Sequence, residues 1–477
     1  MIDVIIIGGG VVGTAVAYEL SKYKLKTMLL EKNQEVGMGT TKANSGIVHA
    51  GYDCKSGTLK AKLNVRGNAL FDELAQNLNI HFRRNGSLVL AFSEEEIDAL
   101  NKLKAQGETN GVKGLRLLSQ SEVLDMEPHI NPEVMAALYA PTAGIVFGSE
   151  LTYALAEAAY ANGVVFHLNI EVYAIKKTEE YYEVQTNKET YFAKTIVNAA
   201  GLYSDDVNNW VSVQKYRIKP RKGEYFLLDK SAKHIVDKTL FQLPTEKGKG
   251  ILILPTIHDN VLIGPSAEHI NDKADLSTNQ DTLSRNIEIA SRSIPNLPMN
   301  LTITTFTGLR ASLENHYDFV IEEVNAGFIT ALGIDSPGLT AAPAIGEHIR
   351  DLIVAYLKPA ENPDFIKTRE EMPLFHELSL DKQKELLAIN PTYGTVICRC
   401  EKITKQDITQ SIHRPVGATT LDGIKFRARA GSGRCQAGFC TTKLIEILAR
   451  ETGVKPWEVT KCGGDSYVLV EEKGGLI

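Results

Sequence analysis

Four of the six cysteines in this 477-residue chain lie close together near its C-terminal end. Cys398 and Cys400 are separated by one residue, and Cys435 and Cys440 are separated by four residues. Thiolates are soft ligands that suit iron–sulfur clusters and zinc. Two close thiol pairs joined by a 34-residue stretch can therefore wrap one compact metal centre.

Three kinds of bonding would account for these cysteines: an iron–sulfur cluster, a structural zinc site or paired disulfides. Disulfides are disfavoured because six cysteines are few for this length and the chain starts directly in a predicted strand, with no secretory leader. Zinc is the stronger alternative, although C-x-C is less usual in a zinc knuckle than C-x2-4-C. Cations would stabilise a negatively charged two-iron cluster and raise its potential, which favours [2Fe-2S]. The cations near the thiols are Arg399, Lys402, Lys425, Arg427, Arg429 and Arg434.

The stretch from Ile424 to Cys440, together with Cys398-Arg-Cys400, resembles the bacterioferritin-associated-ferredoxin type of [2Fe-2S] domain. The resemblance covers roughly residues 395–467. It implies a small, largely helical module in which all four cysteines bind the cluster. Cys462 lies outside the motif and is expected to be a plain small residue, and Cys54 has no cysteine near it in the sequence.

The N-terminal end carries the parts of a dinucleotide-binding unit in the expected order. The β-branched run 3–7 predicts a strand buried on both faces. A G-x-G-x-x-G turn follows, then a helical pattern, then a second strand over 27–30 that ends at Glu31. Such glycines allow a tight turn, close approach to a pyrophosphate and close helix–strand packing, and the acid accepts from ribose hydroxyls. The motif alone does not separate FAD from NAD. Its glycines are Gly8, Gly10 and Gly13.

Two further segments point to a flavin. Small and hydroxyl side chains between residues 39 and 52 can lie along a second phosphate and a ring system. Glycines and a proline interrupt residues 331–345 before a helical pattern that opens near Thr340. A helix N-terminus directed at a flavin would stabilise the negative charge of the reduced ring. An ordinary strand–turn–helix that closes the fold is the alternative for this second segment.

Together these pieces resemble the D-amino-acid-oxidase-like superfamily of FAD enzymes over about residues 2–357. Residues 171–175 and 195–201 match as well. The resemblance implies a backbone contact between Val172 and adenine, and a strand end near the pyrophosphate. The predicted FAD-binding residues are Gly8, Gly10, Gly13, Glu31, Lys32, Thr40, Thr41, Asn44, Ser45, Gly46, Val172, Gly201, Gly338, Leu339 and Thr340.

Two groups within the superfamily resemble this chain best. Residues 44–51, 221–225 and 264–267 match both the FAD-dependent glycerol-3-phosphate dehydrogenases/oxidases and the L-2-hydroxyglutarate dehydrogenases. Residues 244–254 and the C-terminal [2Fe-2S] module resemble the first group, in its dehydrogenase form. This resemblance implies oxidation of sn-glycerol 3-phosphate to dihydroxyacetone phosphate. L-2-hydroxyglutarate, or another 2-hydroxy or amino acid, is the alternative substrate. A non-catalytic FAD and metal redox sensor is the alternative from another class.

Oxidation of a secondary alcohol needs a base for the hydroxyl proton while hydride leaves carbon for the flavin. His49 suits this role because its ordinary pKa lies near working pH, and the resemblance favours it over a core histidine. Arg310 matches the substrate-clamping arginine of the superfamily, and a guanidinium suits phosphate and carboxylate alike. Lys249 would reach the same anion or remain a solvated loop lysine. We expect the electrons to leave through the cluster to an electron-acceptor protein or a membrane-associated subunit.

The bulk composition excludes some classes of protein. The chain is 43% apolar and 23% charged, with a net charge of −6 and a pI near 6.1, so nothing indicates a nucleic-acid partner. The longest apolar runs have strand length, which predicts no membrane-spanning helix. A cytoplasmic location is expected, with peripheral contact at the inner membrane face as an alternative.

The predicted fold class is α/β. A Rossmann-like FAD-binding domain is joined to an antiparallel-sheet substrate domain (α+β) and to a small, mainly helical C-terminal iron–sulfur domain. The expected FAD-binding domain is discontinuous, at 1–80, 140–210 and 305–357. The substrate domain takes 81–139 and 211–304, a linker with a short helix at 381–388 takes 358–394, and the [2Fe-2S] domain takes 395–477.

Overall fold

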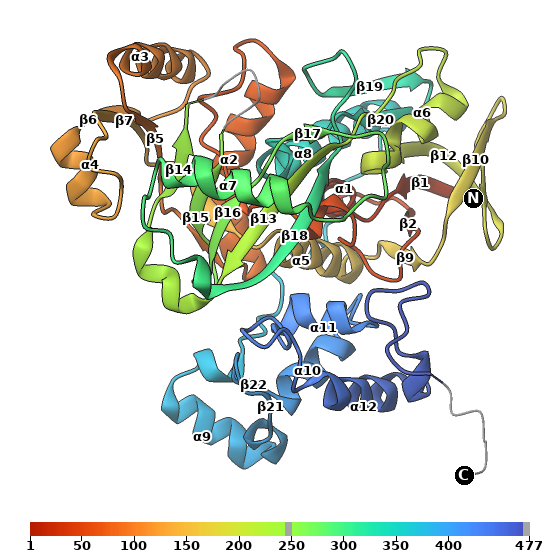
Figure 1. The fold of residues 1–477 in the computed structure, drawn as a ribbon. Coiled ribbons are helices and arrows are strands. Elements are labelled where there is room, and N and C mark those ends of the chain that lie inside the picture. Colours follow the sequence, from red (N-terminus) through yellow and green to blue (C-terminus); the bar gives the residue numbers. More distant parts are fainter. Residues whose placement is uncertain (244–249, 471–477) are drawn as a thin grey trace.

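A computed structural model gives the fold of the chain and describes residues 1–243 and 250–470. Two large sheets with their helices form a body, and a smaller, mainly helical module formed by the C-terminal part of the chain lies against it (Figure 1). The predicted α/β class with a helical C-terminal module is confirmed. In these two ranges no helix combines the length and the apolar character needed to cross a bilayer.

The first sheet has eight strands and a parallel centre. β1 (Ile2–Ile7) pairs in parallel with β2 (Thr27–Glu31) on one side and β12 (Thr190–Asn198) on the other. The β-branched run of β1 is buried on both faces, as its sequence predicts, because helices and loops cover both sides of the sheet. The remaining strands are β9 (Val165–Leu168), β10 (Val172–Lys177), β11 (Tyr182–Thr186), β19 (Val320–Asn325) and β20 (Phe328–Leu332).

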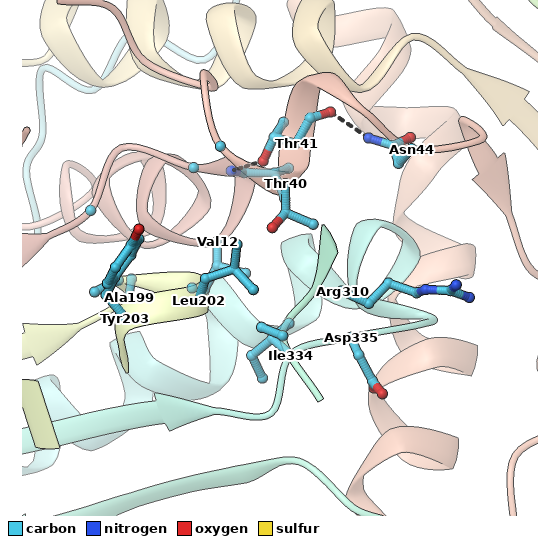
Figure 2. Close-up of a pocket in the computed structure, with 18 of the residues that line it drawn as sticks. Val12, Thr40, Thr41, Asn44, Ala199, Leu202, Tyr203, Arg310, Ile334 and Asp335 are labelled. Carbon is cyan, nitrogen blue, oxygen red and sulfur yellow. Dashed lines mark hydrogen bonds between the residues drawn. The ribbon is translucent and has the colours of Figure 1, made fainter. Parts of the chain in front are cut away.

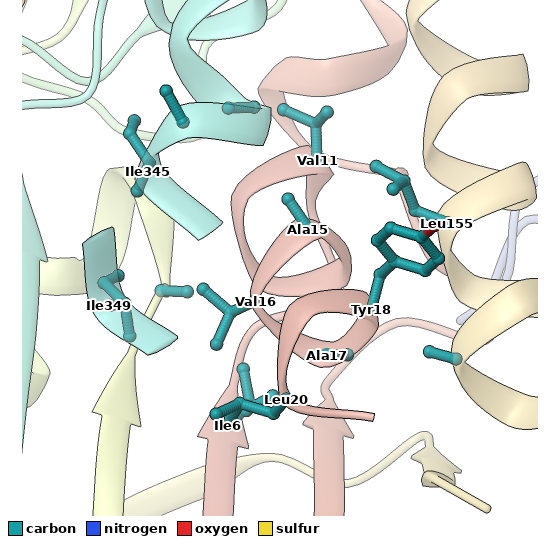
Figure 3. Packing of buried hydrophobic residues seen from close by; sticks show 14 of the residues in the cluster. Ile6, Val11, Ala15, Val16, Ala17, Tyr18, Leu20, Leu155, Ile345 and Ile349 are labelled. Carbon is teal, nitrogen blue, oxygen red and sulfur yellow. The ribbon is translucent and has the colours of Figure 1, made fainter. Parts of the chain in front are cut away.

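Four helices of the body pack on one another beside the first sheet. They are α1 (Val11–Leu20), α2 (Leu59–Leu78), α5 (Gly148–Ala161) and α8 (Gly338–Leu357). Figure 3 shows α1 between α5 and α8, with Val16 facing Ile349 and Tyr18 facing Leu155. Small residues let these helices approach: a Cβ at Gly346 would lie 2.8 Å from the carbonyl oxygen of Ala15. This packing fixes the N-termini of α1 and α8 at one edge of the sheet.

The second sheet has nine strands and is buried on both faces. Leu88 and Leu90 belong to one apolar cluster, and Val89 and Ala91 to another, as expected when strand side chains alternate between two covered faces. The strands are β5 (Ser87–Ala91), β6 (Arg116–Ser119), β7 (Ala136–Ala140), β13 (Arg221–Leu228), β14 (Thr239–Gln242), β15 (Leu252–Pro255), β16 (Val261–Gly264), β17 (Glu268–His269) and β18 (Thr302–Arg310). The helices packed on this sheet are α3 (Glu94–Thr109), α4 (Gln120–Met126) and α7 (Gln280–Ser291), whereas α6 (Ser204–Val211) packs on β10 and β20 of the first sheet.

Two pairings carry functional segments into position. β18 pairs antiparallel with β13, and the register places Arg310 opposite Arg221. A small sheet of β3 (Ile47–Val48), β8 (Gly144–Val146) and β4 (Phe82–Arg83) joins the loop after the glycine turn to the start of α5. Segments that lie far apart in the sequence therefore meet between the two large sheets.

The C-terminal module has an apolar core of its own. Ile403, Ile408 and Ile424 are fully buried in it. The helix α9 coincides with the segment 381–388 for which a short helix is predicted. The elements are α9 (Leu380–Ile389), β21 (Val396–Cys398), β22 (Ile403–Thr404), α10 (Lys405–His413), α11 (Leu421–Ala428) and α12 (Thr441–Thr452).

Buried ion pairs hold the module against the body. Arg427 of α11 pairs with Glu35, which follows β2, and both side chains are almost completely buried. Glu35 also accepts hydrogen bonds from the backbone amides of Thr419 and Thr420, at 3.0 and 2.8 Å. Glu157 of α5 accepts from Arg414 of the module at 2.6 Å. Because breaking a buried pair leaves a charge uncompensated, these contacts fix the module in one place.

Candidate functional site: an FAD cavity and a four-thiol centre

A cavity of about 660 Å³ opens where the strands of the first sheet end. It is lined by the carboxyl-terminal ends of β1, β2 and β12 and by β13 and β18 of the second sheet. Open α/β sheets bind ligands at this edge, and the volume lies within the range of small-molecule sites. Figure 2 shows Tyr203 and Leu202 at one end of the cavity, and Arg310 and Asp335 at the other.

The glycine turn forms a cradle that only glycine permits. Gly8 has a φ of +106°, and a Cβ at Gly13 would lie 1.9 Å from the carbonyl oxygen of Gly8. α1 begins directly after Gly10, so its first amides open on the cavity. The amide of Val11 donates to Oγ1 of Thr41 at 3.1 Å. A helix N-terminus and a close backbone approach fit the pyrophosphate of a dinucleotide.

Glu31 lies at the end of β2, on the cavity wall. Its carboxylate accepts from the amide of Gly9 at 2.6 Å and from the amide of Asn33 at 2.9 Å. Burial raises the pKa of Glu31, and these hydrogen bonds oppose that shift. A carboxylate has further acceptor positions, so the predicted contact with a ribose remains compatible with the geometry. Lys32 lies beside it, 3.6 Å from the centre of the Tyr203 ring.

The loop that follows the glycine turn is fixed by its own hydrogen bonds. Thr40 donates to the carbonyl oxygen of Leu309 at 2.8 Å, Asn44 donates to the carbonyl oxygen of Thr41, and the amide of Gly46 donates to Asn44 at 2.7 Å. Thr40, Thr41, Asn44 and Ser45 line the cavity. Gly46 lies behind the wall, where a Cβ would lie 2.3 Å from the carbonyl oxygen of Val146.

α8 begins at Gly338, two residues before the predicted start, and Gly338 and Leu339 line the cavity. Thr340 is completely buried behind them. Its hydroxyl accepts from the amide of His49 at 2.9 Å and donates to the carbonyl oxygen of Ile47 at 3.2 Å. Thr340 therefore holds the backbone of the histidine instead of facing the cavity.

His49 follows β3 and lines the cavity. Thr340 holds its amide, and the side-chain amide of Asn68 donates to its carbonyl oxygen at 2.9 Å. Its ring lies 5.8 Å from the ring of Phe241, measured between centroids. The backbone of His49 is thus fixed on both sides, which restricts where its imidazole can lie.

Arg310 is the last residue of β18, and backbone carbonyls hold its guanidinium. Nε donates to the carbonyl oxygen of Arg221 at 3.1 Å, and Nη2 donates to those of Lys222 at 3.2 Å and Ser266 at 2.6 Å. Burial, together with the charge of Arg221, lowers the pKa of Arg310 from its ordinary value. Across residues 1–243 and 250–470, no carboxylate forms an ion pair with it. The side chain is therefore oriented while its charge stays available to an anion.

The four cysteines of the predicted metal centre form two sulfur pairs. Sγ of Cys400 lies 3.2 Å from Sγ of Cys435, and the thiol of Cys398 is hydrogen bonded to Cys440. The bond with Cys440 and the amides of Gly431 and Glu401 lower the pKa of Cys398 to about 6. The same bond raises the pKa of Cys440, because the partner sulfur takes the negative charge.

The two-pair arrangement of the sulfurs is compatible with a two-iron cluster. A [2Fe-2S] cluster needs four thiolates divided between two irons. Not every predicted cation is free to face it, since Arg427 pairs with Glu35 and Arg429 pairs with Glu401 at 3.1 Å.

Comparison with known proteins supports both the FAD cavity and the [2Fe-2S] site. Residues 3–352 match the FAD dependent oxidoreductase family, and residues 396–450 match the BFD-like [2Fe-2S] binding domain. The chain belongs to the FAD dependent oxidoreductase family. It is an FAD enzyme, and its C-terminal module is a [2Fe-2S]-binding domain; both predicted cofactors are confirmed.

Three relatives show how far the similarity of this oxidoreductase extends. A glycerol 3-phosphate dehydrogenase of Caloramator mitchellensis is 50% identical over 98% of each chain. A glycerol 3-phosphate oxidase of Mycoplasma genitalium is 35% identical over 76% of this chain and 97% of its own length. The solved structure of an L-alpha-glycerophosphate oxidase from Mycoplasma pneumoniae with FAD bound is 33% identical, with a TM-score of 0.74. It covers 78% of this chain and 99% of that chain.

Most residues predicted for the oxidoreductase's FAD site meet at the one cavity. Val172 and Gly201 line it together with the glycine turn, Glu31 and Lys32. Gly13, Gly46 and Thr340 support the wall from behind. Lys249 lies outside the described residues.

Two lining residues were quoted only as parts of motifs and were not predicted for the site. Arg221 lies opposite Arg310, and the hydroxyl of Tyr225 bonds to Ser45 while its ring stacks on Phe306 at 4.7 Å between centroids. Both lie in the 221–225 motif, but only the pairing of β13 with β18 shows that they face the cavity.

Proposed function

We propose that the protein is a glycerol-3-phosphate dehydrogenase that oxidises sn-glycerol 3-phosphate to dihydroxyacetone phosphate. Electrons then pass through the [2Fe-2S] cluster to an external acceptor, either a protein or a membrane-associated subunit. One observation carries the proposal: an oriented guanidinium, which has no carboxylate partner among the described residues, shares a cavity with His49 and the glycine cradle.

The phosphate of the substrate is assigned to the end of the cavity that holds Arg310. Three carbonyls orient this guanidinium, and Arg221 lines the same end. Two guanidinium groups suit the double charge of a phosphate monoester, and a guanidinium can bind phosphate oxygens in a bidentate way. Lys249 is assigned to the same anion on the grounds of sequence alone.

His49 is assigned as the base that takes the proton of the secondary hydroxyl. Its backbone is held by Thr340 and Asn68, so the imidazole is presented to the cavity from a fixed strand end. When bound, FAD supplies the two-electron acceptor for the hydride that leaves the same carbon.

The relatives support a dehydrogenase with an added electron carrier. The relative named as a dehydrogenase matches 98% of this chain, whereas the relative named as an oxidase matches nearly all of its own length but 76% of this chain. The match to the relative named as a dehydrogenase therefore extends over the [2Fe-2S] module, whereas the relative named as an oxidase is too short to include it. An enzyme that passes its electrons directly to oxygen has no obvious use for such a module.

Anaerobic bleaching of the flavin tests the substrate. Glycerol 3-phosphate should bleach the bound flavin, and His49→Gln should slow this bleaching by about 100-fold or more while FAD content is unchanged. Faster bleaching by L-2-hydroxyglutarate would instead favour the carboxylate substrate, which a guanidinium would also accept. A protein that no substrate bleaches, and in which the histidine variant is silent, would be a redox sensor.

A further inference from the structure

We propose that the exposed rim of the [2Fe-2S] module is a docking surface for a small acidic carrier protein that accepts one electron at a time. The rim consists of Arg399, Cys400, Lys402, Arg434, Phe439 and Lys443, all of which are exposed. The inference rests on the proposed electron route through the cluster and names the kind of partner at its end.

The two sulfur pairs of the thiol centre differ in their access to solvent. Cys398 and Cys440 are 1% and 2% exposed, whereas Cys400 is exposed and Cys435 is partly exposed. Electron transfer between proteins slows steeply with distance, so electrons leave by the edge of the cluster that a partner can approach. That edge is the one bearing Cys400 and Cys435.

Exposed cations lie close in the sequence to the predicted ligand cysteines. Arg399 lies between two ligand cysteines, Lys402 lies two residues after Cys400, and Lys443 lies three residues after Cys440. None of these three cations forms an ion pair with another described residue, unlike Arg427 and Arg429. Arg434 pairs with Asp229, but its side chain is still 72% exposed.

The charge of the module is opposite to that of the whole chain. Residues 395–470 carry 12 Lys and Arg against 7 Asp and Glu, a net charge of +5, although the chain as a whole carries −6. A negatively charged carrier is therefore attracted to the module and repelled by the body. Such a field raises the rate of encounter and orients the partner before contact.

Phe439 gives the rim an apolar centre. It is 87% exposed and directly precedes the ligand Cys440. The other phenylalanine of this segment, Phe426, packs instead against Phe147 of the body, with ring centroids 6.2 Å apart. An exposed aromatic ring on a positively charged module suits a protein-binding surface, where aromatic side chains and arginines are enriched.

The electron balance fits a carrier that takes single electrons. Each glycerol 3-phosphate that becomes dihydroxyacetone phosphate releases two electrons and two protons. Two oxidised carrier molecules would dock in turn, each would leave with one electron, and the two protons would pass to water.

The test uses the holoenzyme, glycerol 3-phosphate and two carriers of opposite charge under anoxic conditions. Rubredoxin, a small acidic iron protein, is the probe, and basic cytochrome c is its counterpart. The second-order rate of rubredoxin reduction should fall at least about tenfold between low and high salt, whereas the rate with cytochrome c should rise or stay level. Cluster absorbance and flavin bleaching by substrate serve as internal references.

Charge reversal locates the docking surface. The triple variant Arg399→Glu, Lys402→Glu, Lys443→Glu should reduce rubredoxin at least about tenfold more slowly at low salt and should lose the salt dependence. Phe439→Ala should slow the reaction without changing the salt dependence. The matched control reverses three exposed lysines of the body, Lys102→Glu, Lys113→Glu and Lys176→Glu, and should react with rubredoxin as fast as the wild type.

Three outcomes would overturn the proposal. In the first, the triple variant and its control reduce rubredoxin at the same rate. In the second, the rate of rubredoxin reduction does not depend on salt. In the third, anionic phospholipid vesicles capture the enzyme through the rim, while the triple variant leaves rubredoxin reduction unaffected. The last outcome would assign the rim to a membrane surface. If glycerol 3-phosphate fails to bleach the flavin, the proposed substrate is wrong, and the same comparison with dithionite-reduced enzyme still tests the docking surface.

Discussion

At two places the FAD cavity relies on backbone groups, at the glycine turn and around Arg310, whereas the predicted cluster site consists of four side-chain thiols. Amides at the start of α1, the glycine turn and the three carbonyls around Arg310 keep their positions at any ordinary pH. The thiols of Cys398 and Cys440 share one hydrogen bond, and thiols must lose their protons before they bind a metal, so assembly of the cluster depends on pH. We therefore expect the fold of the body to tolerate the loss of FAD better than the fold of the module tolerates the loss of its cluster.

The sharpest way to separate the two regions is to remove one of the four cysteines predicted to bind the cluster. Cys435→Ser should abolish reduction of an external one-electron carrier, a loss of more than about 100-fold, because one iron loses a thiolate. Anaerobic flavin bleaching by glycerol 3-phosphate should stay within about twofold of wild type, since the cavity lies in the body. Stopped-flow absorbance measures both rates. Cys462→Ser is the matched control and should change neither; a variant that loses bleaching as well would show that the two centres are not independent.

The buried pair between the regions should be the next most sensitive point. Glu35→Gln leaves Arg427 buried without its counter-ion, which should destabilise docking of the module by about 3 kcal/mol. Proteolysis within residues 358–394 should then become faster, while FAD content is retained. The double variant Glu35→Gln, Arg427→Met should recover part of the loss. Equal cleavage of the wild type and the single variant would show that the ion pair does not hold the module.

A methyl group in the glycine turn should affect the body alone. Gly13→Ala places a Cβ 1.9 Å from the carbonyl oxygen of Gly8, so the turn must shift at a cost of about 1–3 kcal/mol. FAD affinity, measured by flavin fluorescence, should fall about 10- to 100-fold, while the visible absorption of the cluster remains. Ala15→Gly in the same helix adds no atom to the turn and should retain FAD. An unchanged FAD affinity in Gly13→Ala would show that the glycine turn does not form the binding site for the pyrophosphate.

Replacing the oriented guanidinium should affect substrate binding more than chemistry. Arg310→Lys keeps the positive charge but loses the paired N–H donors of the guanidinium. The resulting loss of about 2 kcal/mol in substrate-binding free energy should raise the substrate concentration for half-maximal bleaching about 30-fold. The limiting bleaching rate at saturation should change less. A variant with an unchanged concentration dependence would place the phosphate elsewhere in the cavity.

The smallest effect concerns pH at the contact between the regions. The bond to Glu150 raises the pKa of His81 to about 9, and Glu377 near the module adds to this shift. Because the folded pKa lies above the unfolded one, the stabilisation is complete below about pH 6.5 and is lost as pH rises through about 9. The side chain is half exposed, so the effect should stay below about 1 kcal/mol. Thermal unfolding of wild type and His81→Asn should therefore differ at pH 6 and converge above pH 9.

Local sequence predicted the parts of the site that are made by neighbouring residues. The strand, the glycine turn and the acid at Glu31 lie within about thirty residues of one another. The spacing of the four cysteines likewise predicted a metal centre without knowledge of the fold. Pairing over long distances was not visible in the sequence. Arg221 faces the cavity only because β13 pairs with β18, and Thr340 turns away because its hydroxyl bonds His49 instead.

The central claim is that electrons captured in the body leave through the module. The most direct measurement is an anoxic titration of the holoenzyme with glycerol 3-phosphate, followed by visible absorption and by electron paramagnetic resonance of the cluster. The account predicts that the flavin bleaches and that the cluster becomes reduced in the same titration, with Cys435→Ser showing the bleaching alone. A flavin that bleaches fully beside a cluster that stays oxidised would contradict it.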